Sequence, residues 1–145
     1  MGESISFFVP GIPIPEGSTR VLTSKLGRPF ITHVNQDKLE AWRRAIALVA
    51  VHEARKAGWK LPLDEPVMAA AVFTLKQPKT PRFLYPAVKP DLDKLGRAVG
   101  DGLCPRRGQR LLIEDSRIIA WTLVKQYGDR PGVHITISRE AEPNE

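Results

Sequence analysis

The sequence predicts one small domain of mixed α/β class. The chain has 145 residues, a usual size for a single globular domain, and 42% of them are hydrophobic, which is enough for one core. Short apolar runs typical of strands alternate with two segments of helical periodicity. The expected order is strand, loop, helix, strand, helix and three further strands. We expect the domain to cover residues 1–137 and a polar, disordered tail to cover residues 138–145.

The first half of the chain contains the clearest helix. Residues 5–9 predict a short strand, and residues 20–24 and 29–34 flank a glycine-containing turn and predict a ragged hairpin. Asn35 is a suitable N-cap for the helix that follows, because apolar residues then recur at steps of three and four. Gly58 is the expected end of this helix.

The second half contains further strands around a second helix. This helix should begin just after Pro90 and end near Leu103, where Cys104 and Pro105 interrupt it. The preceding residues 77–90 are rich in proline and lack the periodicity of a regular element, so they predict a long loop. Strands are expected at residues 67–75, 111–113, 118–127 and 133–137, the last two forming a hairpin around a turn at 128–132.

Positive charge is concentrated in the middle of the chain. Residues 76–110 contain nine basic and three acidic residues, so this stretch has the same formal charge, +6, as the whole chain. A concentrated positive field attracts polyanions and suits phosphate contacts, which makes nucleic acid the leading partner class. A merely solubilising surface is the alternative. The residues that we expect to contact a nucleic-acid backbone are Lys76, Lys79, Arg82, Lys89, Lys94, Arg106, Arg107 and Arg110.

The composition disfavours several other classes of protein. Cys104 is the only cysteine, so no disulfide framework and no cysteine-based zinc cluster can form within one chain. No run of about 18 or more apolar residues occurs, and residues 1–10 lack the features of a signal peptide. We therefore expect a soluble, cytoplasmic protein, whether its gene belongs to a cell or to a virus.

Four acidic residues at element boundaries are the candidates for chemistry. Asp91 and Asp93 stand at the start of the second helix, and Glu114 and Asp115 directly follow the apolar run 111–113. Asp91 is expected at the N-cap, outside the helical spiral, so that its carboxylate can converge with that of Asp93. If the second pair packs beside the helix start, three or four carboxylates meet in a basic stretch. Each residue alone has a plainer explanation, as a helix cap or a turn former.

A cluster of carboxylates attracts a hard divalent cation, because the carboxylates repel one another and need a compensating positive charge. Mg²⁺ prefers a few carboxylate oxygens and retained waters, whereas a site without His or Cys is unsuited to zinc. Such an ion polarises a phosphate and lowers the pKa of a bound water. Arg97, one helical turn after Asp93, either stabilises charge that develops on the phosphate or forms an ordinary i, i+4 ion pair.

Four segments around these residues have a distinctive order and spacing. They are KPDLDKL at 89–95, RAV at 97–99, DGL at 101–103 and IEDSRI at 113–118. In both respects they resemble the signature of the RusA family of Holliday-junction resolvases. The resemblance implies a small mixed α/β domain that forms a homodimer. It also implies that three aspartates bind a catalytic Mg²⁺ or Mn²⁺ ion, at the positions Asp91, Asp93 and Asp115.

Three positions depart from the family pattern. Lys94 stands where Asn is frequent, Glu114 replaces a frequent Asp, and Arg97 takes the place of a catalytic lysine. Arginine keeps the positive charge but does not readily lose a proton. The last change therefore preserves a phosphate-stabilising role and disfavours a role in proton transfer.

Residues and resemblance together predict a Mg²⁺-dependent endonuclease that resolves Holliday junctions and related branched DNA by paired nicks. One alternative is a non-catalytic protein that binds junction DNA, and another is a broader nuclease that acts on flaps or forks. Phe83 and Tyr85, in the proline-rich loop, either stack on unpaired bases or anchor the loop to the core. Gly96 and Gly100 permit the close approach of another backbone or of DNA. The predicted catalytic residues are Asp91, Asp93, Asp115 and Arg97.

Overall fold

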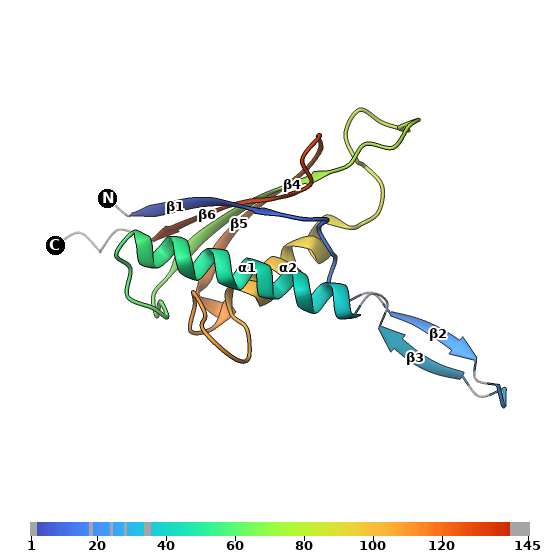
Figure 1. Cartoon of the computed structure of the whole chain (residues 1–145), viewed down its shortest axis with the longest axis horizontal. Helices are drawn as coiled ribbons and strands as arrows, with labels where there is room; N and C mark the ends of the chain where they lie inside the picture. The colour runs from blue at the N-terminus through green and yellow to red at the C-terminus, as the bar shows by residue number, and fades with distance from the viewer. Residues whose placement is uncertain (1–2, 18, 24, 28, 34–35, 140–145) are drawn as a thin grey trace.

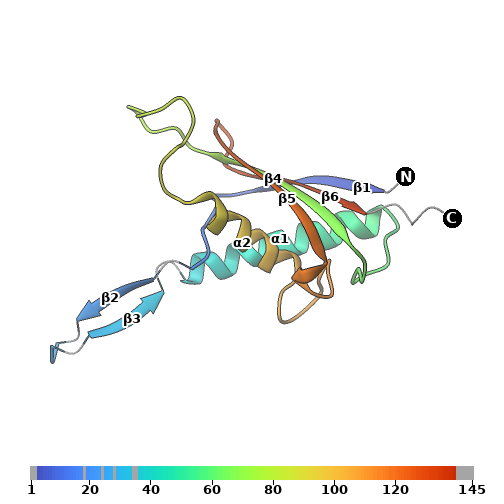
Figure 2. The same ribbon diagram turned by 180° about the vertical axis from the view of Figure 1, so that it is seen from behind.

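The computed structural model describes residues 3–17, 19–23, 25–27, 29–33 and 36–139, and it contains a four-stranded sheet with two helices on one face (Figure 1, Figure 2). The sheet has the strand order β1-β6-β4-β5, in which β4 and β5 run parallel and the other neighbours antiparallel. Strands β2 and β3 form a separate hairpin that projects from this body (Figure 1). The elements are β1 (Ser4–Pro10), β2 (Thr19–Thr23), β3 (Pro29–His33), α1 (Gln36–Lys56), β4 (Val67–Leu75), α2 (Leu92–Leu103), the short 3₁₀ helix η1 (Asp115–Arg117), β5 (Ile118–Tyr127) and β6 (Gly132–Arg139).

The core lies between the sheet and the two helices. In β4 every second side chain is buried, and three of these, Ala69, Ala71 and Phe73, point toward the helices. Trp42 and Ile46 are buried on the inner face of α1, as the predicted stripe requires. The predicted mixed α/β domain is thereby confirmed.

Most of the predicted elements occur close to their expected positions. α2 begins after Pro90 and ends at Leu103, and α1 ends just before Gly58, which has a positive φ of 82° and donates its N–H to Arg55 O at 2.9 Å. The predicted N-cap Asn35 lies outside the described residues. No helix within the described ranges is long and apolar enough to span a lipid bilayer.

The C-terminal strand is longer than predicted. β6 continues to Arg139, two residues beyond the expected end of the domain, and the N–H of Arg139 donates to Glu3 O at 2.7 Å. Residues 132–138 are paired with β1 on one side, and the full length of β6 is paired with β4 on the other. The rest of the predicted tail, residues 140–145, lies outside the described residues.

The hairpin predicted for the last two strands is wrong. β4 lies between them, parallel to β5 and antiparallel to β6. The turn after Tyr127 does reverse the chain, as its glycine and proline residues indicate, but it crosses the end of β4, where Gly128 N donates to Leu75 O at 3.0 Å. Turn chemistry reveals a change of direction and not the identity of the strand that is next in the sheet.

The strand predicted at residues 111–113 is also wrong. Leu111 and Leu112 are fully buried, and both of their N–H groups donate to Leu103 O, at 3.0 and 3.1 Å. One isolated parallel bridge joins Leu112 to Leu63. The apolar run is therefore an extended segment that closes the end of α2 against the core. Its hydrophobicity reflects burial and not membership of the sheet.

The glycines of α2 serve helix packing. A Cβ atom at Gly102 would lie 2.8 Å from Ile46 Cγ2 of α1, and one at Gly96 would lie 2.7 Å from Leu123 Cδ1 of β5. A Cβ atom at Gly100 would meet Trp121 at 3.7 Å, an ordinary contact. Gly96 and Gly100 face side chains of β5, and not another backbone as one of the two expectations had it. α2 is thus wedged between α1 and β5.

Candidate active site

Asp91 occupies the N-cap position of α2, as predicted, but its side chain does not cap the helix. Its backbone is extended, with φ −69° and ψ 137°, and its carboxylate makes no hydrogen bond to the first turn. The side chain is 52% exposed, and one carboxylate oxygen lies 3.8 Å from Lys94 Nζ. This carboxylate is therefore available to an external ligand, while the neighbouring lysine compensates part of its charge.

Asp93 and Arg97 lie exposed on one face of α2, one turn apart. The structure shows no ion pair between them, so the simple i, i+4 explanation of Arg97 is not supported. The Arg97 guanidinium lies instead near the N-terminal loop, where a Cβ atom at Gly17 would be 3.8 Å from Arg97 Nη1. The same loop is fixed to α2 by a hydrogen bond from Glu16 N to Lys94 O at 2.9 Å.

Asp101 lies two turns further along α2 and belongs to a network that joins three segments. Arg43 of α1 forms a two-pronged ion pair with Glu16, with Nε 3.0 Å from Glu16 Oε2, and its Nη2 lies 3.7 Å from Asp101 Oδ2. Burial raises the pKa of Asp101 to about 6, helped by the hydrogen bond and charge of Glu16 and by the charge of Asp115, while Arg43 acts in the opposite direction.

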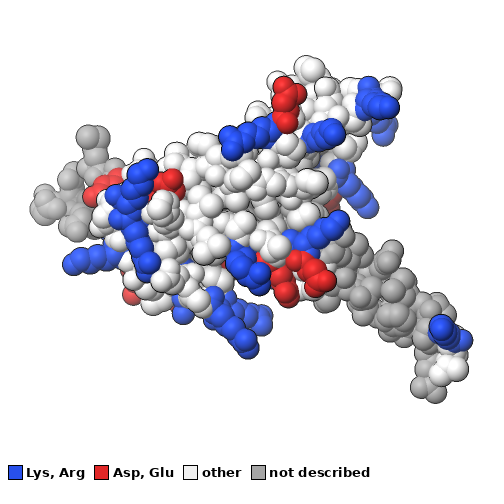
Figure 3. All heavy atoms as spheres, viewed as in Figure 1, with Lys and Arg blue, Asp and Glu red and all other residues white. Residues whose placement is uncertain are grey.

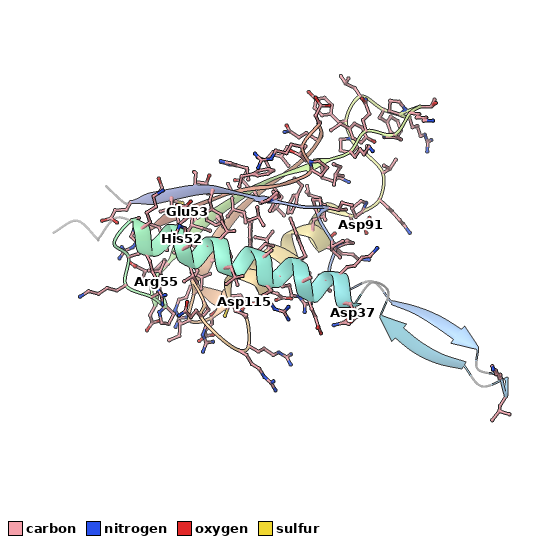
Figure 4. The ribbon with its side chains drawn as sticks, in the orientation of Figure 1. Asp37, His52, Glu53, Arg55, Asp91 and Asp115 are labelled. Carbon is pink, nitrogen blue, oxygen red and sulfur yellow. The ribbon has the colours of Figure 1, made fainter. Side chains whose placement is uncertain are left out.

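Asp115 begins the 3₁₀ helix η1, which contacts α2, and its charge acts on Asp101. Its neighbour Glu114 accepts a hydrogen bond from Ser116 Oγ at 2.9 Å and lies 3.7 Å from Arg117 Nη2. Figure 4 labels Asp91 at the start of α2 and Asp115 near its far end. Asp93 and Asp101 are separated by about 12 Å along the helix axis, at roughly 1.5 Å per residue. The structure thus places Asp115 beside Asp101 and leaves Asp91 and Asp93 at the other end of the helix.

The carboxylates have the chemistry that a hard cation requires, but they do not form a complete set of ligands around one point. Within the described part of the chain, no three His, Cys, Asp or Glu side chains lie close enough together to hold a metal ion. Mg²⁺, however, is commonly bound by one or two carboxylates together with waters and substrate phosphates. The exposed carboxylates of Asp91 and Asp93 meet this lesser requirement, and a phosphate group would supply further oxygen ligands.

The basic residues predicted to bind DNA form two groups that α2 separates. Lys76, Lys79, Arg82 and Lys89 belong to a loop that projects beyond the end of β4, whereas Arg106 and Arg107 belong to the loop after α2, on the other side of the molecule (Figure 1, Figure 2). Figure 3 shows blue atoms in several separate groups over one face of the molecule. The remaining two residues have internal partners, since Lys94 pairs with Asp91 and Arg110 Nη1 donates to Ile113 O at 3.3 Å.

A groove of about 1530 Å³ runs between α1 and the loop after α2. One wall carries Arg44 and Arg55 of α1, and the other carries Arg106 and Arg107. All four arginines are exposed and form no ion pair with other described residues. Asp101 and Asp115 also line the groove, so these four arginines and two of the acidic residues share one surface.

Sequence reasoning missed several residues that shape this site. Asp101 was detectable, because it lies on the same helical face as Asp93 at a spacing of eight residues. Glu16 and Arg43 come from distant segments, and no local pattern links them. Lys125 of β5 was also missed: its Nζ donates to Val88 O at 2.8 Å and to Pro90 O at 2.9 Å, immediately before Asp91.

Fold and site together define a small α/β protein in which exposed carboxylates lie between two surfaces suited to a polyanion. The sequence profile of the family described as Endodeoxyribonuclease RusA matches residues 10–138. The chain therefore belongs to this family, and it is an endodeoxyribonuclease that acts on crossover (Holliday) junctions and depends on a divalent metal. No curated protein matches the chain.

Proposed function

We propose that the protein is a Mg²⁺-dependent resolvase that acts as a homodimer and cuts opposed strands of a Holliday junction in paired nicks. Mn²⁺ is expected to replace Mg²⁺. The observation that carries the proposal is the exposed Asp91 carboxylate, which takes the N-cap position without capping the helix, has Lys94 Nζ at 3.8 Å as its ion-pair partner, and stands next to exposed Asp93. Because this carboxylate does not bond the helix, it is open to an external ligand, and a hard cation is the ligand that two neighbouring carboxylates suit.

The proposed roles follow from charge and position. Asp91 and Asp93 would hold the metal ion together with water and phosphate oxygens, and the bound ion would polarise the phosphate and acidify a water molecule. Asp115, the third ligand implied by the family motif, lies at the other end of α2 and would have to move toward Asp91 and Asp93 to bind the same ion. Arg97 is exposed on the same face as Asp93 and stabilises negative charge on the phosphate. Since arginine stays protonated, Arg97 takes no part in proton transfer.

The DNA backbone is proposed to follow the two basic surfaces. The eight basic residues predicted from the sequence are proposed to contribute to this contact, six of them from the projecting loop and the arginine-lined groove. Lys94 and Arg110 would have to exchange their internal partners for phosphate oxygens. The groove adds Arg44 and Arg55, which sequence reasoning did not select. Arginines without internal ion pairs are free to contact phosphate oxygens, and the affinity that they supply should fall with salt.

The decisive experiment compares the wild type with Asp93→Asn on a labelled, mobile four-way junction. We expect the wild type to nick the junction when Mg²⁺ is added, and the variant to bind the junction in EDTA but not to nick it. Asp129→Asn is the matched control, because Asp129 is an exposed aspartate in the turn between β5 and β6. Its nicking rate should equal that of the wild type.

Two results would favour the alternatives. Binding without nicking by the wild type, in Mg²⁺ and in Mn²⁺, would indicate a non-catalytic junction-binding protein. Nicking of linear duplex, flaps and four-way junctions at equal rates would indicate a broader nuclease.

A further inference from the structure

Three adjacent side chains of the projecting loop, which we call its tip, are unusually exposed for their apolar character. Phe83, Leu84 and Tyr85 have exposed fractions of 43%, 80% and 66%. The loop that carries them extends beyond the end of β4 (Figure 1). Since the three side chains are exposed, they do not anchor the loop to the core. A contiguous exposed apolar group of this kind marks a site of interaction.

The base of this loop is held in place while its tip stays free. Pro86, directly after the tip, is buried, and Ala87 N donates to Tyr85 O at 2.7 Å. Lys125 of β5 then binds the carbonyl groups of Val88 and Pro90, at 2.8 and 2.9 Å. The tip is thus presented in a defined position, which lowers the entropy lost when it binds. Asp91 directly follows Pro90, so the same hydrogen bonds also hold the start of the acidic site.

The charges around the tip indicate the kind of partner. Residues 76–90 contain four basic residues and no acidic residue. Arg82 lies over the ring of Phe83, 5.0 Å from its centroid, so that a cation and an aromatic face are presented side by side. Aromatic rings flanked by cations suit nucleic-acid bases flanked by phosphates. In linear duplex the faces of the bases are covered by their neighbours, whereas a branch point leaves base faces accessible.

We propose that the Phe83–Leu84–Tyr85 tip wedges against the bases at the branch point of the junction and thereby selects branched over linear DNA. The inference rests on the proposed function for the kind of DNA that is bound, and it is independent of catalysis. The basic residues of the loop contact phosphates on either side of the branch and contribute equally to linear and branched DNA. Only the tip distinguishes branched from linear DNA.

The test measures affinity in EDTA for a four-way junction and for a linear duplex of the same sequence. The wild type should prefer the junction. In the variant F83S/Y85S the junction affinity should fall roughly tenfold or more while the duplex affinity changes little, given the usual contribution of base stacking. The variant F83W/Y85W keeps two aromatic faces and should keep the preference. A 2-aminopurine at the branch point should change its fluorescence with the wild type and not with the serine variant.

The matched control is K76Q/K79Q, which removes charge from the same loop and leaves the tip intact. It should weaken junction and duplex binding by the same factor and lower the slope of log K against log salt by about 2. An unchanged preference in F83S/Y85S, or an equal loss on both DNAs, would overturn the wedge. A wild type that binds the junction no better than the duplex would overturn it too. Absence of nicking in Mg²⁺ contradicts only the proposed function, because every binding measurement here omits the metal.

Discussion

At the scale of single residues, the fold changes the protonation of Asp101. Its carboxyl is half-buried and is influenced by Glu16, Asp115 and Arg43. Burial, together with the two acidic neighbours, raises its pKa from the ordinary value of 3.8 to about 6. The folded protein therefore binds this proton more tightly than the unfolded chain does.

The consequence is a loss of stability as the pH rises. The tighter binding of this proton stabilises the folded state. This stabilisation is fully present below the pKa of the unfolded chain, near 3.8, and is lost as the pH rises through about 6. We expect the difference in the free energy of unfolding, Asp101→Asn minus wild type, to increase as the pH rises from 4.5 to 7.5. Because the Asp101 side chain is 46% exposed, solvent screening keeps the gain smaller than the shift alone implies.

Urea unfolding in EDTA at several pH values measures this difference. The same series for Asp129→Asn, in an exposed turn, provides the baseline. Parallel pH profiles for the wild type and Asp101→Asn would contradict the assignment of the raised pKa to this carboxyl.

At the scale of elements, the contact between α1 and α2 determines how the groove and the acidic network are placed. At Gly102 an added Cβ atom would lie 2.8 Å from Ile46 Cγ2, 2.9 Å from Ile46 Cβ and 3.2 Å from the backbone oxygen of Arg43. Because one of these neighbours is backbone, the crowding is not relieved by a rotamer change alone. The helices must separate.

We therefore expect Gly102→Ala to destabilise the protein. Crowding typically costs about 1–3 kcal/mol, which exceeds the gain of about 1 kcal/mol from replacing a helical glycine by alanine. Gly100→Ala is the control in the same helix, since its added Cβ atom meets only Trp121, at 3.7 Å. It should raise the free energy of unfolding by up to about 1 kcal/mol. Thermal and urea unfolding distinguish the two, and a stabilised Gly102→Ala would refute the close contact.

At the scale of the whole molecule, the activity of a junction resolvase requires two cuts in opposed strands. One chain offers one acidic site, so paired nicks are most simply made by two copies related by a two-fold axis. We expect light scattering on a size-exclusion column to give twice the mass of one chain, for the wild type and for Asp93→Asn alike. A single-chain mass at concentrations where junctions are nicked would contradict the homodimer.

The sequence predicted the helices and the longer strands because these elements follow from local patterns. The steps of three and four in α1, the glycine at its end and the prolines around α2 act over a few residues. The same holds for Asp91 at the start of α2. The strand at 111–113 and the last hairpin were predicted wrongly, because burial of Leu111 and the insertion of β4 between two later strands depend on distant partners.

By itself, then, the sequence determined the class of fold, the motif of the RusA family and the acidic residues that the motif contains, since all of these are encoded in spacing along the chain. Only the tertiary structure decided that Arg43 joins Glu16 to Asp101, that Lys125 anchors the segment before Asp91, and that α2 divides the basic stretch into two surfaces. The physical reason is that ion pairs and packing depend on distances through space. Residues that are far apart in the chain acquire those distances only when the sheet and helices close on a common core.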